Sequence, residues 1–128
     1  MSTLTISNLN DGTTTVPTTY ITNGSAKAWL NLNGTGTIAI RDSLNTSSVT
    51  DESTGKYTQT YVSNMSSDDY SVSTSAGSDR GYIETVKVNR YNQFEPIYTN
   101  GMQVVTYNNS SSYYDTHFVL LQSFGDLA

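Results

Sequence analysis

The feature that most constrains this chain is a strict alternation of apolar and other residues over residues 26–33. Small or aliphatic side chains occupy every second position, at Ala26, Ala28, Leu30 and Leu32. Successive side chains of a β-strand point to opposite faces, so this period of two predicts a strand with one buried face. No window has the i, i+3, i+4 apolar spacing of an amphipathic helix. The chain is therefore expected to be all-β.

Seven further segments show short alternating or β-branched patterns, and Gly, Asn, Asp and Ser clusters separate them. They cover residues 37–41, 47–50, 56–63, 69–76, 82–90, 102–107 and 116–124. Strands at this spacing are typical of a sandwich or barrel. We predict an antiparallel, jelly-roll-like β-sandwich of about eight strands over residues 26–128. The last strand is apolar on both sides, which predicts burial on both faces or a subunit contact.

The hydrophobic core is expected to be thin. Leu, Ile, Val and Phe together number 26 of 128 residues, whereas Ser, Thr and Asn number 50. Ten Tyr and one Trp add large side chains that a fold can bury. A small domain with so few aliphatic residues gains stability when a neighbouring subunit covers more of it. This composition favours an oligomer.

Residues 1–25 differ from the rest because their apolar side chains are sparse. A segment this polar cannot bury enough surface to offset its conformational entropy. We expect an extended N-terminal arm with a turn at Asn10-Asp11-Gly12, which docks on another surface. A flexible tail is the alternative interpretation.

Charge and composition exclude several classes of protein. Six basic and eleven acidic residues give a formal net charge of −5, which argues against a nucleic-acid partner. No segment approaches the ~18 apolar residues of a membrane span, so no membrane insertion is expected. The chain has no cysteine, which excludes disulfides and thiol catalysis.

The sequence predicts no enzyme, no metal site and no cofactor. The single histidine, His117, lies within the last predicted strand and is expected to be half-buried or at an interface. The adjacent carboxylates Asp51/Glu52 and Asp68/Asp69 lie in Ser-rich turns, where Asp usually bonds its own backbone. Gly34-Thr35-Gly36 precedes a strand rather than a helix, so it is not a phosphate-binding loop.

Tyrosines in and beside the later loops are the candidate ligand-binding residues. They are accompanied by asparagines, and loops rich in Tyr, Asn, Ser and Gly make adaptable recognition surfaces. Aromatic faces beside amide groups also suit sugar rings. Alternatively, these rings cover the thin core and point their hydroxyls outward. The candidates are Tyr91, Tyr98, Tyr107, Tyr113 and Tyr114.

Residues 26–43, AKAWLNLNGTGTIAIRDS, carry a resemblance to a known family. They resemble a module of tail-fibre-like proteins from marine and freshwater phages, many of them cyanophages. The usual sequence of this module is close to AKAWVNFNGTGTVAIR. The likeness continues through Asn45–Asp51, Gly55-Lys56-Tyr57-Thr58 and the Met65 to Tyr70 element, and ends at Phe124-Gly125. It covers about residues 1–76 and 116–128, whereas residues 77–114 depart from it.

The resemblance implies a phage virion protein that assembles as a homotrimer on the particle surface. A tail-fibre or receptor-binding role would bring residues 77–114 to a host surface glycan or protein. A capsid decoration, or cement, role would instead use the arm to hold neighbouring coat subunits. Other virion proteins, of the tail or the capsid, are the implied partners, and a chain this short is expected to be a fibre tip, a small adhesin or a decoration protein.

Overall fold

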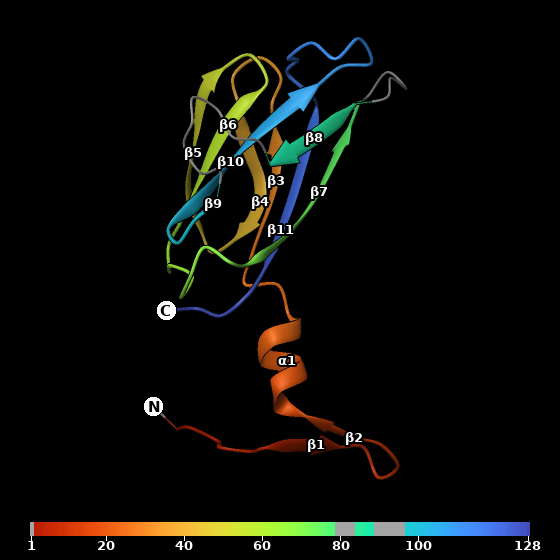
Figure 1. Ribbon diagram of the computed structural model, residues 1–128, viewed down its shortest axis with the longest axis vertical. Helices are drawn as coiled ribbons and strands as arrows, with labels where there is room; N and C mark the ends of the chain where they lie inside the picture. The colour runs from red at the N-terminus through yellow and green to blue at the C-terminus, as the bar shows by residue number, and fades with distance from the viewer. Residues whose placement is uncertain (1, 79–83, 89–96) are drawn as a thin grey trace.

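The computed structural model describes residues 2–78, 84–88 and 97–128, which form a two-layer antiparallel β-sandwich below which an N-terminal arm projects (Figure 1). One sheet has the order β4-β3-β11-β7, comprising Ala39–Leu44, Ala28–Asn33, Phe118–Phe124 and Ser71–Gly77. The second has the order β5-β6-β10-β8, comprising Thr46–Ser53, Lys56–Tyr61, Gly101–Tyr107 and Thr85–Val88. A short strand, β9 (Ile97–Tyr98), also pairs with β10.

The core lies between the two sheets and follows the predicted alternation. In β3, Ala28, Leu30 and Leu32 are buried, while Trp29 on the opposite face is half-buried. The same period in β6 buries every second residue. The other buried hydrophobic residues of the core cluster are Tyr57, Tyr61, Met65, Tyr70, Val86, Met102, Val104, Val119 and Leu121.

The two sheets are joined at one side by a corner at Asn45. This residue has a left-handed φ of 55° between the last residue of β4 and the first of β5. Asn tolerates this conformation better than most residues. Its side chain pairs with Ser63 by accepting from the backbone N–H at 2.7 Å and donating to the carbonyl at 2.9 Å. At the other side, β7 lies along β8, and Thr74 Oγ1 donates to the Val86 carbonyl at 3.1 Å.

The predicted strands are present, but their order in the two sheets differs from that of a jelly roll. The eight predicted segments coincide with β3–β8, β10 and β11, although residues 82–83 and 89–90 lie outside the described part of the chain. The strand order is not jelly-roll-like, because β3 and β4, and also β5 and β6, are hairpin neighbours within one sheet. The last strand is central, but its outer face is not covered, since Leu120 is 37% exposed.

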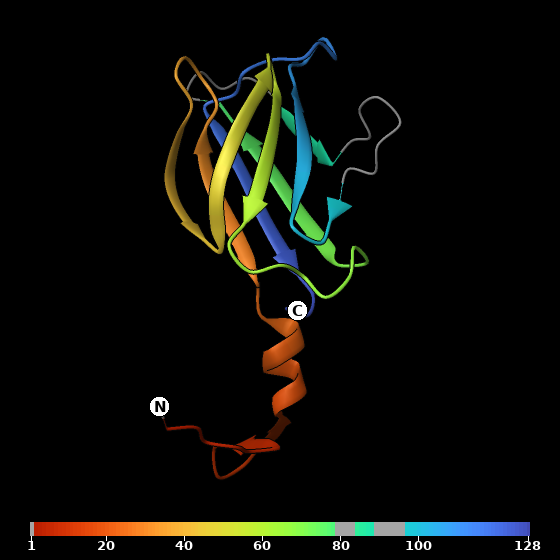
Figure 2. The same ribbon diagram turned by 90° about the vertical axis from the view of Figure 1, so that its left-hand side faces the viewer.

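The arm is not extended throughout, which corrects the expectation for residues 1–25. β1 (Asn8–Asn10) and β2 (Thr15–Pro17) form a hairpin around the predicted turn, where Asp11 Oδ1 accepts from the Thr13 and Thr14 amides. Thr18–Gly24 then forms a helix, α1. Pro17 fixes its own φ at −57° directly before α1, and Thr22 Oγ1 donates back to the Thr18 carbonyl. No residue of α1 is buried, and the arm stands clear of the sandwich (Figure 2).

Candidate functional site

The outer face of the β5-β6-β10-β8 sheet lies toward the viewer in Figure 2. In β6 the inner residues are Tyr57, Gln59 and Tyr61, so the strand alternation places Lys56, Thr58 and Thr60 on the outer face. In this region Thr58 Oγ1 donates to Glu52 Oε1 at 3.0 Å, and Gln103 Nε2 donates to Thr58 Oγ1 at 3.3 Å. The face therefore combines hydroxyl, amide and carboxylate groups.

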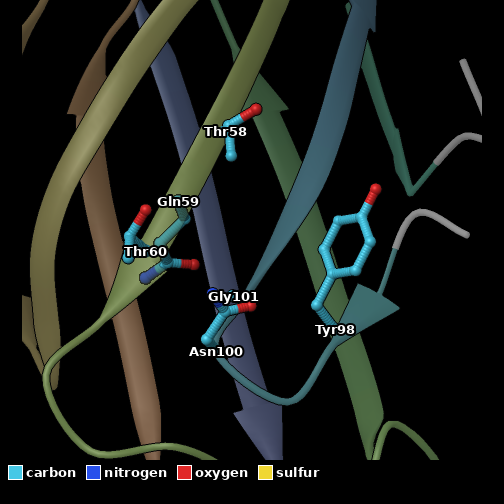
Figure 3. Close-up of a pocket in the computed structure, with 6 residues that line it drawn as sticks. All are labelled: Thr58, Gln59, Thr60, Tyr98, Asn100 and Gly101. Carbon is cyan, nitrogen blue, oxygen red and sulfur yellow. The ribbon is translucent and has the colours of Figure 1, made fainter. Parts of the chain in front are cut away.

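A pocket of about 300 Å³ opens at the end of this sheet where β9 pairs with β10 (Figure 3). Gly101 is paired with Thr60 on one side and with Tyr98 on the other. Because Gly101 has no side chain, the floor between these two residues is backbone. A Cβ at position 101 would overlap the Gln59 carbonyl oxygen, so the site requires glycine. The lining residues are Thr58, Gln59, Thr60, Tyr98, Asn100 and Gly101.

Hydrogen bonds from beneath hold the pocket in shape. The buried Tyr70 hydroxyl lies 2.8 Å from the Gly101 carbonyl oxygen and 3.1 Å from that of Tyr98. The Tyr61 amide donates to the Asn100 carbonyl at 2.8 Å, and the Met65 amide donates to that of Thr99 at 2.7 Å. A site fixed in this way does not have to be ordered when a ligand binds, which favours affinity.

The two tyrosines below the pocket remain neutral phenols over the ordinary pH range. Burial is the main cause that raises the pKa of Tyr70, and the neighbouring Tyr61 adds to the effect. Burial likewise raises the pKa of Tyr61. The Tyr61 hydroxyl lies 3.1 Å from that of Tyr70 and 2.9 Å from Ser123 Oγ. These hydroxyls form a structural network under the site.

A cluster of two tyrosines and two lysines, which we call the Tyr–Lys cluster, lies at the other end of the same sheet. Tyr107 and Tyr113 are stacked with ring centroids 5.0 Å apart and an interplanar angle of 25°. Lys56 Nζ lies 4.4 Å from the centroid of Tyr113, and Lys87 Nζ lies 5.2 Å from that of Tyr107. Both distances are within the range of a cation–π interaction.

The loop before β11 is anchored to the β5–β6 turn by Asp115. Its Oδ1 accepts from the Gly55 amide at 2.6 Å and lies 3.1 Å from the Tyr57 hydroxyl. Gly55 has a φ of +66°, and a Cβ there would lie 2.7 Å from the Tyr114 amide nitrogen. Thr106 Oγ1 also donates to the Tyr114 carbonyl. These contacts fix the backbone that carries Tyr113 and Tyr114 at the end of the sandwich opposite the arm (Figure 1).

The five candidate tyrosines do not form one group. Tyr98 lines the pocket, Tyr107 and Tyr113 stack in the Tyr–Lys cluster, and Tyr114 is 43% exposed beside it. Tyr91 lies outside the described residues. Four further residues of this face were not predicted from the sequence, namely Thr58, Thr60, Lys56 and Lys87, although the alternation of residues 56–63 already places the first three on one face.

The outer face of the other sheet carries apolar side chains. Trp29 pairs with Leu44 of β4 and with Gln122 of β11, and Leu44 is 48% exposed. A shallow groove of about 320 Å³ lies here, lined by Trp29, Leu30, Asn31, Ser73, Thr74, Ser75, Leu120, Leu121 and Gln122. The second sheet does not cover Trp29, so burial of this side chain would require a neighbouring subunit.

The remaining candidates for chemistry are metal ligands and the single histidine among the residues that the structure describes. The described residues contain no group of three or more His, Asp or Glu residues that could hold a metal ion. The His117 ring packs edge-on against Phe118 at 4.7 Å, and its backbone carbonyl accepts from Arg41 Nη1 at 2.7 Å. Within the same residues, no helix has the length and apolarity to cross a membrane.

Comparison with protein-family models, with curated proteins and with solved structures finds no match to this chain.

Proposed function

We propose that this chain is a bacteriophage virion surface protein of the tail-fibre or receptor-binding type, and that it contacts a glycan on the host surface. The observation that carries the recognition role is the preformed pocket between Thr60 and Tyr98. It offers hydroxyl and amide groups beside an aromatic ring, and hydrogen bonds fix its floor. The phage assignment rests on the resemblance of residues 26–43 to the tail-fibre-type module.

The position of the pocket agrees with this role. It lies on the outer face of the β5-β6-β10-β8 sheet. The arm projects from the end of the sandwich and does not cross this face (Figure 2), so the arm itself leaves the pocket accessible. The polar side chains that line the pocket are few and lie close together. Small-molecule sites share this property, because a small number of polar groups fixes the orientation of a ligand.

Adsorption to the host tests the proposal directly. The fluorescently labelled chain should bind host cells, and a lipopolysaccharide or capsule extract of those cells should compete with it. Periodate treatment of the cells, which oxidises vicinal diols of sugars, should abolish the binding, whereas protease treatment should not. Binding that survives periodate and disappears with protease would assign a protein receptor instead.

A second candidate function is capsid decoration, and the arm is the observation that favours it. Its apolar residues remain exposed in the single chain, among them Leu4 at 82%, Leu9 at 43% and Tyr20 at 72%. Exposed apolar residues on a projecting segment mark a surface for a partner. Immunogold labelling of virions distinguishes the two roles, because a cement protein would label the head and a fibre protein the tail.

The proposal includes assembly as a homotrimer, as the resemblance implies. The partly exposed Trp29, Leu44 and Leu120 on the outer face of the β4-β3-β11-β7 sheet are the surface that such a contact would bury. This surface is opposite the pocket, so an interface there would leave the pocket open on each subunit. The three pockets of one trimer would raise the apparent affinity for a repeated glycan.

A further inference from the structure

The groove on the outer face of the β4-β3-β11-β7 sheet lies beside two apolar side chains. The strand register arranges this face in rows, and in one row Trp29 pairs with Gln122, which pairs in turn with Ser73. In the next row Leu120 pairs with Ser75. Because the serine side chains of β7 are short, they leave a groove of about 320 Å³ beside Trp29 and Leu120.

The polar groups around this groove are available to a partner. Among the residues that the structure describes, the side chains of Gln122, Ser73 and Ser75 make no hydrogen bond. The lining of the groove also contains no charged residue. Such a surface suits a neutral chain segment, whose apolar side chains fill the hollow while its backbone groups meet the hydroxyls and the amide.

A trimer needs a second surface to cover this face. A two-fold axis joins a patch to the same patch of its partner, whereas each contact around a three-fold axis joins two different surfaces. Within the described part of the chain, the largest group of exposed hydrophobic side chains outside this face lies in the arm. Its members are Leu4, Ile6, Leu9, Val16, Tyr20 and Ile21.

The first part of the arm has the chemistry that the groove would accept. Residues 2–7 run in an extended path before β1 (Figure 1), and none of them is charged. Leu4 and Ile6 are both exposed, and alternate residues of an extended segment point to one side. Residues 2–5 make no hydrogen bond with the described residues, so their backbone groups are available as well.

The arm is directed toward a neighbouring subunit rather than toward its own groove. It leaves the sandwich directly before β3, where the Lys27 amide donates to the Ser123 carbonyl at 2.8 Å. From this junction α1 points away from both sheets (Figure 2). At about 1.5 Å per helical residue and 3.3 Å per extended residue, α1 and residues 2–7 together measure roughly 30 Å, which is the diameter of a small domain.

We infer that the arm of each subunit docks on the next subunit of the trimer, with Leu4 and Ile6 in the groove beside Trp29 and Leu120. The inference rests on the proposed homotrimer and names the segment that closes it. Docking of residues 2–24 would match the roughly 20–30 residues that each side of a standard interface contributes. An exchange of identical segments links the subunits without a further protein.

Cysteine cross-linking tests this contact, because the natural chain has no cysteine. Leu4→Cys and Ser73→Cys are introduced together into the full-length chain, and copper phenanthroline oxidises neighbouring thiols to disulfides. We expect a covalent trimer on a non-reducing gel. The two single variants, refolded together, should give a covalent species that contains one chain of each.

A matched pair of cysteines controls for random collision. Leu4→Cys combined with Ser110→Cys should remain monomeric on the same gel, because Ser110 is exposed in the turn at the end opposite the arm (Figure 1). Cross-linking of this pair to the same extent would show an arm without a fixed site and would refute the inference.

Charge on one side of the segment tests the placement of the two apolar residues. Leu4→Glu combined with Ile6→Glu should shift the trimer to monomers at micromolar concentration, because a charge at an apolar contact loses its hydration. The fluorescence of Trp29, the single tryptophan, should then move to longer wavelength. Thr3→Glu combined with Thr5→Glu places the same charges on the opposite side and should keep the trimer. Equal dissociation of both variants would contradict this placement.

The other outcomes separate the inference from the proposed function. A disulfide within one chain of the Leu4→Cys and Ser73→Cys variant, seen by mass spectrometry of the monomer, would refute exchange between subunits. No cross-link in a chain that native mass spectrometry shows as a trimer would refute the docking of the arm and leave the trimer standing. A monomeric wild-type chain would refute both, while the cell-adsorption assay reports separately on glycan recognition.

Discussion

The Tyr57 hydroxyl lies 3.1 Å from Asp115 Oδ1, and this contact joins the middle of the sandwich to the loop that carries Tyr113 and Tyr114. The same carboxylate oxygen accepts from the Gly55 amide, so one side chain fixes two segments. Asp115 therefore anchors the loop that carries these tyrosines to the β5–β6 turn.

Replacing Asp115 with Ala should loosen this tip. The substitution removes the acceptor of the partly buried hydrogen bond from the Gly55 amide. A buried donor that is left without a partner lowers the free energy of unfolding by about 1–3 kcal/mol. Urea denaturation measures the loss of stability, and hydrogen exchange of the Gly55 and Tyr114 amides measures the loosening. Asp115→Asn, which retains the oxygen, is the control and should lose less. Unchanged exchange in Asp115→Ala would show that the loop is held by other contacts.

The fold should lose stability at alkaline pH. Burial raises the pKa of Tyr57, with Asp115 as the second cause, and burial raises those of Tyr61 and Tyr70. In the unfolded chain these phenols ionise near the ordinary value of about 10. The unfolded state then releases protons that the folded state retains, so the stabilisation is present below about pH 10 and is lost as the pH rises above it.

Urea denaturation across this pH range measures the effect. The midpoint should fall steeply above about pH 10, and phenolate absorbance should show buried tyrosines ionising together with unfolding. Tyr61→Phe removes one ionisable hydroxyl, so its slope of stability against pH should be shallower. A midpoint that stays constant up to the pH of complete ionisation would contradict this prediction.

The strands of the sandwich were predictable because inward-facing and outward-facing residue types alternate within single short segments. Residues 26–33 and 56–63 display the period of two. The structure buries the predicted Leu30 face of the first segment and the Tyr57 face of the second, for which the sequence had not specified the inner face. The helix α1 was not predictable, because Thr18–Gly24 contains three threonines and has no apolar stripe. The helix is supported by the hydrogen bond from Thr22 Oγ1 to the Thr18 carbonyl and by Pro17 directly before it. Neither feature produces a periodic pattern in the sequence.

The site was only partly predictable, for a different reason. Tyr107 and Tyr113 flank a polar turn, so their proximity could be inferred from the sequence, and the two residues form an isolated β-bridge. Lys56 and Lys87 are far apart in the chain, and only the register of both strands against β10 brings them into one row. Register depends on the packing of the whole sheet, which no short segment encodes.

The half-buried Trp29 should become fully buried when the protein assembles. Trp29→Glu should convert the expected trimer into monomers, because a charge at an apolar contact loses its hydration. Native mass spectrometry measures the change. Trp29→Phe should keep the trimer, and Val62→Glu, at a side chain 69% exposed elsewhere, is the control for added charge. A folded wild-type monomer at micromolar concentration, with Trp29 fluorescence accessible to acrylamide, would refute assembly through this face.

Removing residues 1–22 should leave the sandwich folded. Every member of the buried core cluster lies at or beyond Ala28, so the truncation removes none of them. We expect an unchanged β-type circular dichroism spectrum and weaker attachment to virions that lack the protein. A loss of the β-type spectrum would mean that the arm is an integral part of the fold and that the boundary near residue 25 is wrong.

The pocket should contribute to host adsorption independently of the tip. Tyr98→Ala removes the aromatic wall, and Thr60→Val removes the opposite hydroxyl with little change in volume. Each neutral hydrogen bond contributes about 0.5–1.5 kcal/mol, so Thr60→Val should weaken adsorption a few-fold per site. The double variant Tyr113→Ala and Tyr114→Ala tests the tip, and Tyr20→Ala in the arm is the matched control. Normal adsorption by both the pocket and the tip variants, with the trimer intact, would favour the capsid-decoration role.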